Sequence, residues 1–197
     1  MQLITIRANL KDMLNTRGDD VSYIEEHGDA VEPSRYFMEL VTLNTDKTTI
    51  FFALTKDILK DLRQNNESAE EMIEKYGTKN FIVILNEIAT SNYINHFQQK
   101  DKELALHKEN GMLQIFYKKE LTYNQLKHTM VPKHEKLTDN EGKQIMNDYL
   151  IKNKTQLPII SKTDIISRWL GLKVGEIFRI IRYNKTSGEY FYYRVCI

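Results

Sequence analysis

The stretch that most constrains the fold is the C-terminal third of the chain, residues 130–197, because prolines and glycines divide it into short segments. Five of these prolines and glycines lie at the ends of apolar stretches: Pro132, Pro158, Gly171, Gly175 and Gly188. Both residue types interrupt helices and strands, so each one predicts the end of an element. The segments between them are short. This third therefore predicts a small, compact α/β module.

Two helices and a hairpin are predicted in this module. The first helix begins at Thr138, because Thr138 and Glu141 fit a capping box, in which each side chain binds the other residue's backbone amide. Its buried stripe is expected at Ile145, Met146, Tyr149 and Leu150.

The second helix is expected to begin near Ser161 or Thr163 and to end at a left-handed Gly171. Its predicted apolar face consists of Ile165, Ile166, Trp169 and Leu170. The chain then alternates as a hairpin, from residues 177–183 to residues 189–197 around Gly188.

Five short motifs in this module resemble the assembly domain of one family. They are VPKH (131–134), QLP (156–158), LGLKVGE (170–176), IIR (180–182) and SGEYFYYR (187–194). The family is the fifth subunit shared by the nuclear DNA-dependent RNA polymerases, whose archaeal counterpart consists of little but this domain. The order and spacing of the five motifs make the resemblance specific, whereas any one of them alone would be weak.

The resemblance implies a non-catalytic subunit that docks on the largest polymerase subunit, contacts other subunits and lies near downstream duplex DNA. It implies no catalytic residue, metal or cofactor, because the catalytic aspartates of the polymerase belong to its largest subunit. The residues expected to bind partners are Lys133, His134, Arg168, Lys173, Arg179, Arg182, Tyr192 and Arg194.

The first two thirds of the chain predict a separate α/β layer with a mixed sheet. Apolar periodicity predicts helices over residues 2–16, 56–64, 68–77 and 91–99 and strands over residues 36–43, 48–54, 81–85 and 113–117. Ser68 and Glu71 form a second capping box. Residues 19–35 are expected to be a polar connector, and the charge-dense residues 100–110 a solvated helix end or loop.

The family resemblance is looser in this part. KDMLNTRG (11–18) is similar to the end of the family's first helix, and FIVIL (81–85) precedes a helix as in the family's jaw domain. The family has a proline at the start of that helix, where this chain has ATSN (89–92). The resemblance implies a jaw-like domain over residues 1–128 and an assembly domain over residues 130–197. A shorter jaw and an Asn-, Ile- and Lys-rich composition suit a divergent member, such as one from a large DNA virus.

Charge is divided unevenly between the two parts. Residues 131–197 carry 12 Lys and Arg against 7 Asp and Glu, which gives +5, and residues 1–130 carry 16 against 20, which gives −4. This asymmetry suits a component that docks between a nucleic-acid-binding machine and its partners, and it is equally compatible with ordinary surface variation.

The single cysteine, Cys196, excludes an internal disulfide and favours a reducing compartment. The sequence contains no apolar run of about 18 residues, so no membrane span is predicted. The N-terminus lacks the layout of a signal peptide. We expect an intracellular protein, in the nucleus if cellular, or in the virion and host cytoplasm if viral.

Motifs for other chemistry are weak. The histidines His27, His96, His107, His128 and His134 are scattered and predict no metal site, and His134 is expected to make a structural hydrogen bond. A nuclease centre would need an acidic pair and a lysine on adjacent strands, but Glu39, on a predicted strand, has no Glu-x-Lys on the next one. The sequence has neither a Walker lysine loop nor a Gly-x-Gly-x-x-Gly motif.

The remaining candidate is the basic, aromatic hairpin. Arg179, Arg182, Tyr190, Tyr192 and Arg194 are compatible with one face that meets nucleic acid, with a protein interface, or with a solvated sheet face. The resemblance favours the protein interface. A nuclease-like enzyme and a free-standing DNA-binding adaptor remain the alternative functions.

Overall fold

The structure is a computed structural model that describes residues 2–24, 31–64, 67–186 and 188–197. His27 and Ser187 lie outside the described residues. Contacts divide the chain into two compact units, Met1–Tyr123 and Asn124–Ile197, and each is described by itself. Each unit combines helices with a mixed sheet, so the predicted α/β class is confirmed.

The first unit is built on a four-stranded sheet of order β1-β2-β3-β4. The strands are β1 (Val41–Asn44), β2 (Thr48–Ala53), β3 (Asn80–Leu85) and β4 (Met112–Tyr117). β1 runs antiparallel to β2, whereas β2, β3 and β4 are parallel. β2 is buried along its whole length and β3 nearly so, which explains why both read as continuous apolar runs.

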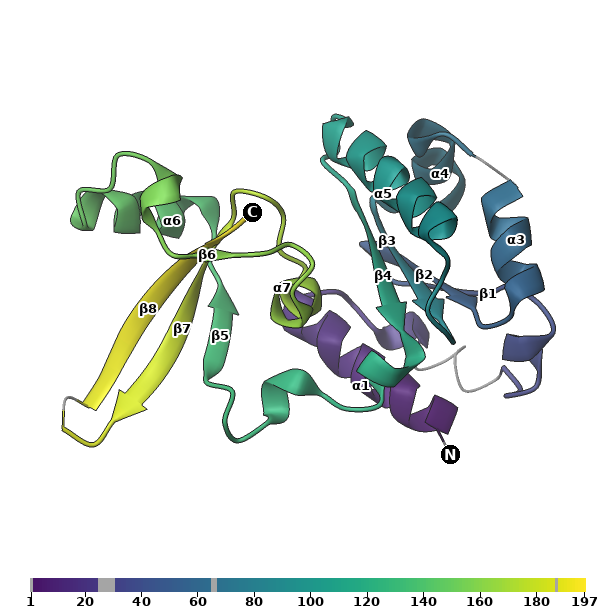
Figure 1. Cartoon of the computed structure of the whole chain (residues 1–197), viewed down its shortest axis with the longest axis horizontal. Helices are drawn as coiled ribbons and strands as arrows, with labels where there is room; N and C mark the ends of the chain where they lie inside the picture. The colour runs from purple at the N-terminus through teal and green to yellow at the C-terminus, as the bar shows by residue number, and fades with distance from the viewer. Residues whose placement is uncertain (1, 25–30, 65–66, 187) are drawn as a thin grey trace. The chain divides into compact units, whose positions relative to one another are not determined.

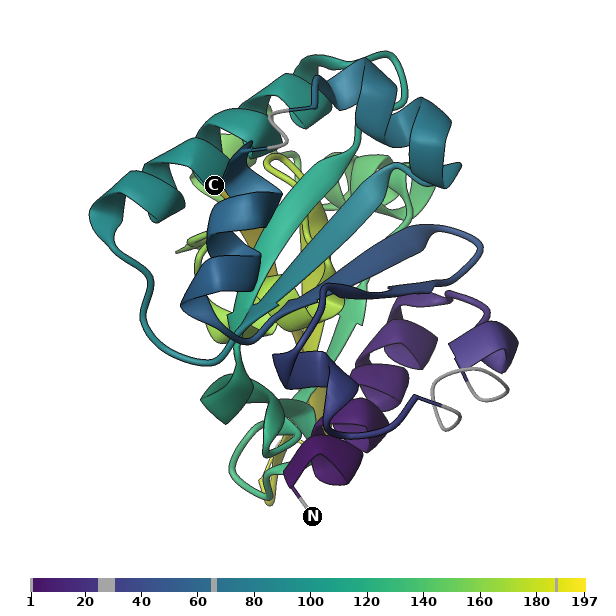
Figure 2. The same ribbon diagram turned by 90° about the vertical axis from the view of Figure 1, so that its right-hand side faces the viewer.

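Helices cover both faces of this sheet. On one face lie α3 (Lys56–Gln64), α4 (Ala69–Tyr76) and α5 (Ser91–Leu106), and on the other lies α1 (Gln2–Arg17), as Figure 1 and Figure 2 show. The three-helix face encloses a core that includes Phe51, Phe81 and Phe97. Ser68 caps α4 with the predicted capping box, and Gly77 ends it in the left-handed conformation.

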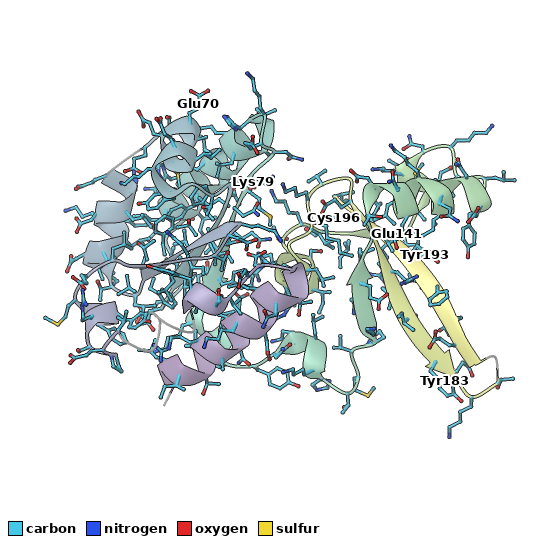
Figure 3. All side chains as sticks on the ribbon, turned by 180° about the vertical axis from the view of Figure 1, so that it is seen from behind. Glu70, Lys79, Glu141, Tyr183, Tyr193 and Cys196 are labelled. Atoms are coloured by element: carbon cyan, nitrogen blue, oxygen red, sulfur yellow. The ribbon has the colours of Figure 1, made fainter. Side chains whose placement is uncertain are left out.

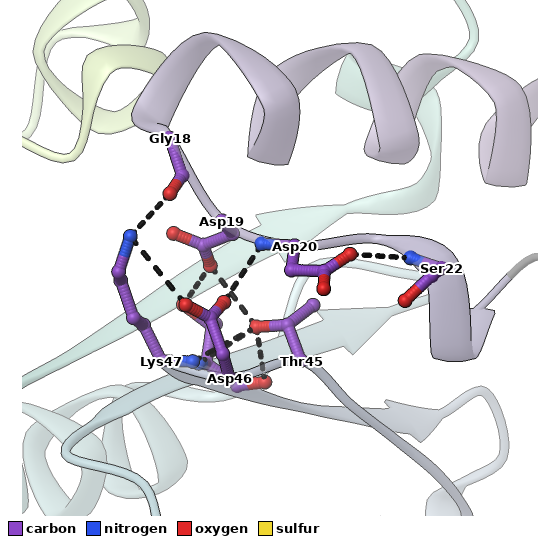
Figure 4. Close-up of polar contacts among 8 residues, drawn as sticks. Gly18, Asp19, Asp20, Ser22, Thr45, Asp46 and Lys47 are labelled. Atoms are coloured by element: carbon purple, nitrogen blue, oxygen red, sulfur yellow. Dashed lines mark hydrogen bonds and ion pairs between the residues drawn. The ribbon is translucent and has the colours of Figure 1, made fainter.

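A polar cluster joins the end of α1 to the turn between β1 and β2 (Figure 4). The buried carboxylate of Asp19 accepts hydrogen bonds from the hydroxyls of Thr45, at 3.1 Å, and Thr48, at 2.5 Å. The Lys47 ammonium donates to the carbonyl of Gly18. Because the buried Asp19 carboxylate is hydrogen-bonded by two hydroxyls of the β1–β2 region, the cluster fixes the end of the helix on the sheet.

The second unit is built on a sheet of order β5-β7-β8-β6. The strands are β5 (Lys133–Lys136), β6 (Ile159–Ile160), β7 (Ile177–Asn184) and β8 (Gly188–Cys196). β7 pairs antiparallel with both β5 and β8, whereas β6 runs parallel to β8. The unit also contains α6 (Asp139–Asp148), α7 (Ile165–Leu170) and the short 3-10 helices η3 (Gln125–Lys127) and η4 (Lys154–Gln156).

Two small cores hold this unit together, one on each face of the sheet. Ile145 and Met146 of α6 pack with Ile177 and Val195. On the opposite face, Leu170 and Ile166 of α7 pack with a set of strand residues, Phe178, Ile180 and Cys196. The capping box of Thr138 and Glu141 and the left-handed Gly171 are present as predicted.

Several predicted boundaries are wrong. The strand expected over residues 36–43 begins only at Val41, because Tyr36 lies in the 3-10 helix η1 (Arg35–Phe37) and buries its ring against Phe52, 4.8 Å between centroids. α5 continues to Leu106 instead of ending at residue 99. In its last turns Leu104 is fully buried and the Asp101 carboxylate accepts a hydrogen bond from the Leu113 amide of β4 at 3.0 Å, so these turns pack against the sheet.

The second unit also departs from prediction. Asp164, not Ser161 or Thr163, caps α7, and the VPKH segment leads into strand β5. Tyr149 and Leu150 do not continue the buried stripe, since they are 62% and 85% exposed. α6 ends before them in a Schellman motif, with Leu150 at a φ of 54° and the Ile151 amide donating back to the Met146 carbonyl. Ile151 therefore packs in the core in their place.

Candidate functional site

The β7–β8 hairpin carries four of the eight predicted partner-binding residues, β5 beside it carries two more, and the three strands display these residues on two opposite faces. Strand residues alternate between the faces, and the register pairs Arg179 with Tyr193 and Arg182 with Tyr190. We define the Arg179 face as Lys133, Glu135, Arg179, Ile181, Tyr183, Glu189, Phe191 and Tyr193. We define the Tyr192 face as His134, Arg182, Tyr190, Tyr192 and Arg194.

This division corrects the expectation that Arg179 shares one face with the other hairpin residues. Arg179 is an odd-numbered position and Arg182 an even one on the same strand, so their side chains leave opposite sides of the sheet. Figure 3 shows two tyrosines of the Arg179 face, with Tyr183 toward the tip of the hairpin and Tyr193 nearer α6. The Tyr193 ring meets Tyr149 edge-on at 5.8 Å.

The charges of the Arg179 face are paired within the unit. Arg179 donates to Glu135 Oε2 through Nε at 3.1 Å and Nη2 at 2.5 Å, and Lys133 Nζ lies 2.7 Å from Glu135 Oε1. The hydrogen bonds from Lys133 and then Arg179 lower the pKa of Glu135 below its ordinary value. The Arg179 guanidinium also lies over Phe191, 5.0 Å from the ring centroid.

The Tyr192 face has a different composition. The guanidinium carbons of Arg182 and Arg194 lie 5.0 Å and 5.6 Å from the centroid of the Tyr192 ring. His134 makes the expected structural hydrogen bond, 2.6 Å between Nδ1 and the Pro132 carbonyl, and its ring stacks on Phe178. Burial lowers the pKa of His134, and the positive charges of Arg194 and Arg182 lower it further against the effect of the Pro132 bond. His134 is therefore mostly neutral at pH 7.

The other two predicted residues lie outside strands β5, β7 and β8. Arg168 lies in α7, where its Nε donates to the Thr163 carbonyl at 3.1 Å. Lys173 lies in the turn after α7, and its backbone amide donates to the Glu176 carboxylate at 2.7 Å. The structure thus brings together four of the eight predicted residues, namely His134, Arg182, Tyr192 and Arg194, on one face.

Sequence reasoning missed two residues that shape these faces. Glu135 neutralises Arg179, and Phe191 supports its guanidinium. Phe191 was predictable from strand alternation, because it lies two residues from Tyr193, the residue of β8 opposite Arg179, and so faces the same side of the sheet. Glu135 was not accessible in this way, since the pairing of β5 with β7 joins residues 44 positions apart.

In the described part of the first unit, Glu39 is not placed as a nuclease centre would require. Glu39 lies before β1 rather than on a strand, and its exposed carboxylate pairs with Arg35 of η1. Over the parts of the chain that the structure describes, no group of three His, Cys, Asp or Glu residues is arranged to hold a metal ion. Within the same residues, no helix has the length and apolar character needed to cross a membrane.

Comparison with known proteins finds relatives of both units among RNA polymerase subunits. The family described as RNA polymerase Rpb5, C-terminal domain, matches residues 123–196. A Dictyostelium discoideum protein named DNA-directed RNA polymerases I, II, and III subunit rpabc1 is 27% identical over 203 residues, which cover all of this chain and 98% of that protein. The Caenorhabditis elegans subunit RPABC1 is 36% identical over 86 residues, covering 44% of this chain and 40% of that protein.

An archaeal relative is more similar over the second unit alone. The DNA-directed RNA polymerase subunit Rpo5 of Methanosarcina acetivorans is 43% identical over 75 residues. This alignment covers 38% of this chain but 95% of the archaeal protein. With the matched family, these similarities confirm the resemblance that the five motifs carry, and the chain belongs to the Rpb5 family of RNA polymerase subunits.

Proposed function

We propose that this chain is a non-catalytic structural subunit of a multisubunit DNA-directed RNA polymerase. The observation that carries the proposal is the match of the second unit to nearly the whole of an archaeal protein named as a polymerase subunit, 95% of its length at 43% identity. A stretch that constitutes a complete subunit elsewhere is here one unit of a longer chain. Its function is therefore expected to be assembly with other polymerase subunits.

The two units have different roles in this proposal. Residues 130–197 are the assembly domain, which docks on the largest subunit through residues drawn from the eight predicted positions. Residues 1–128 are a jaw that lines one side of the downstream DNA channel. The net charges of +5 for residues 131–197 and −4 for residues 1–130 support a basic docking module attached to a body that does not itself hold DNA tightly.

The absence of catalysis belongs to the proposal too. Glu39, the acidic residue on which a nuclease reading depends, is exposed, outside the strands and paired with Arg35. The proposed site of action is inside the cell, in the nucleus for a cellular member of the family, or in the virion and host cytoplasm for a viral one.

Affinity purification of the tagged full-length chain from its native source, washed at high salt, tests the proposal. We expect the two largest polymerase subunits in near-equal amounts with the tagged chain, identified by mass spectrometry. Recovery of the chain without polymerase subunits would contradict the proposal.

Two further assays address the alternatives. Mg²⁺-dependent cleavage of DNA that is lost in Glu39→Ala would establish a nuclease. Duplex binding by the isolated chain at physiological salt, with a Kd of about 1 μM, would establish an adaptor that acts alone.

A further inference from the structure

The two faces of the β7–β8 hairpin differ in how their charges are compensated. On the Arg179 face, the two cations Lys133 and Arg179 share the Glu135 carboxylate. Glu189 lies on the same face of β8. On the Tyr192 face, by contrast, the strands contribute Arg182 and Arg194 with no carboxylate of their own.

Neither arginine of the Tyr192 face forms an ion pair with a residue of the described chain. Both rest on the Tyr192 ring, and the Nε of Arg194 is buried without a hydrogen-bond acceptor among the described residues. Two acidic groups on this side are already engaged. Asp164 acts on His134 electrostatically, but its carboxylate accepts from the Ile166 amide to cap α7, at 2.8 Å, and the Glu176 carboxylate pairs with Lys136 at 2.8 Å. A buried donor without an acceptor costs free energy unless an outside group satisfies it.

Next to this face runs an open sheet edge. β8 spans Gly188–Cys196, but β6 covers its outer side only at Val195 and Cys196. The Val195 amide points outward, since it donates to the Pro158 carbonyl at 2.9 Å. Strand alternation directs the amides of Tyr193 and Phe191 to the same side, where no strand of the described chain pairs with them. Such an edge accepts an added strand.

We propose that an extended acidic segment of a polymerase subunit pairs with this open edge of β8 and places its carboxylates on Arg182 and Arg194. The proposal deepens the proposed function and rests on it. Every second side chain of an added strand faces the Tyr192 face, so the segment should carry Asp or Glu at alternate positions. A planar guanidinium held over the Tyr192 ring, as those of Arg182 and Arg194 are, is suited to bind a carboxylate through two parallel hydrogen bonds.

A protein segment fits this surface better than a DNA duplex does. The amides along the β8 edge are spaced to meet the carbonyls of a peptide strand, whereas duplex binding relies on many phosphate contacts, on the order of 6–10 in strong binders. The Tyr192 face offers two arginines.

Site-specific photo-crosslinking compares the two faces directly with a matched pair of tyrosines. Tyr190 on the Tyr192 face and Tyr183 on the Arg179 face are 40% and 79% exposed, and both lie near the tip of the hairpin. Each is replaced in the full-length tagged chain by a benzophenone amino acid, the polymerase is purified from the native source, and the crosslinked peptides are sequenced. We expect position 190 to yield an acidic segment of a polymerase subunit and position 183 to yield little product.

Charge-neutral variants test the arginines. In Arg182→Gln/Arg194→Gln, recovery of the largest subunit after a high-salt wash should fall by about tenfold or more, because two charge-assisted contacts are lost. The control Lys143→Gln/Lys152→Gln removes the same charge from exposed positions of the same unit and should leave recovery unchanged. Arg179→Gln, on the opposite face, should change recovery by less than about twofold. Circular dichroism and thermal unfolding of each full-length variant establish that it is folded.

The outcomes separate this inference from the proposed function. If the wild-type chain recovers no polymerase subunits, the proposed function fails. If the wild type recovers them but a folded Arg182→Gln/Arg194→Gln variant does so equally well, or if position 190 crosslinks to DNA or to a segment without acidic residues, the inference is overturned while the proposed function stands.

Discussion

Two glycines illustrate how the surroundings of one Cα atom decide the effect of adding a methyl group. Gly142 lies in α6, where a Cβ would meet Ile177 Cδ1 at an ordinary 3.6 Å. Gly111 precedes β4, where a Cβ would lie 2.3 Å from the Lys79 carbonyl oxygen. The first position has room for a side chain, and the second does not.

We therefore predict opposite effects of the same substitution. Gly142→Ala should raise the free energy of unfolding of the second unit by about 1 kcal/mol, because alanine favours the helix and the methyl group finds ordinary contacts. Gly111→Ala should lower that of the first unit by about 1–3 kcal/mol, because backbone must move to relieve the overlap. Urea unfolding followed by circular dichroism measures both. A stabilising effect of Gly111→Ala would contradict the close approach of Gly111 to the Lys79 carbonyl.

At the scale of the elements, the pairing of β5 with β7 has a charged cross-strand contact whose strength depends on pH. Glu135 lies opposite Arg179 in the register. Lys133 and Arg179 lower its pKa in the folded state. A carboxyl group with a lowered folded-state pKa stabilises the protein above its unfolded-state pKa, and this contribution disappears as the pH falls through the folded value.

We predict that Glu135→Gln destabilises the second unit at about pH 7 by no more than about 1 kcal/mol, since the group is partly exposed to solvent. The difference from wild type should begin to shrink as the pH falls below about 4, near the pKa of an unperturbed glutamate, and should disappear once the pH lies below the lowered folded-state pKa, where the carboxylate is protonated in both states. Thermal unfolding across this pH range measures it, with Glu189→Gln as the control on the same face. A difference that stays constant down to acidic pH would show that Glu135 acts by packing rather than by charge.

At the scale of the whole molecule, the second unit should fold without the first. It has its own sheet and two small cores, and an archaeal subunit consists of little more than the matching stretch. We predict that the fragment 124–197 unfolds cooperatively on heating and gives a dispersed NMR spectrum. A small domain of this size is marginal, so its stability should be only a few kcal/mol, about 3–5. An unfolded fragment would mean that the first unit is required for its stability.

Much of the fold follows from short-range signals in the chain. Ser68 with Glu71 and Thr138 with Glu141 begin helices as capping boxes, and Gly171 ends one in the left-handed conformation. In each capping box the hydrogen bonds from backbone amides join residues only three positions apart, so the local sequence is sufficient to predict them. Elements that depend on distant partners were harder to predict. β5 and β6 are too short to show periodicity, and they are strands only because β7 and β8 pair with them.

The sequence by itself determined the α/β class, the family and the eight candidate positions, because apolar periodicity, caps and ordered motifs are local properties that a linear chain displays. Only the tertiary structure decided how those positions are grouped. It placed Arg179 beside Glu135 on one face of the hairpin, and Arg182 and Arg194 around Tyr192 on the other. Charge compensation depends on distances between residues far apart in the chain, and these distances exist only once the strands have paired.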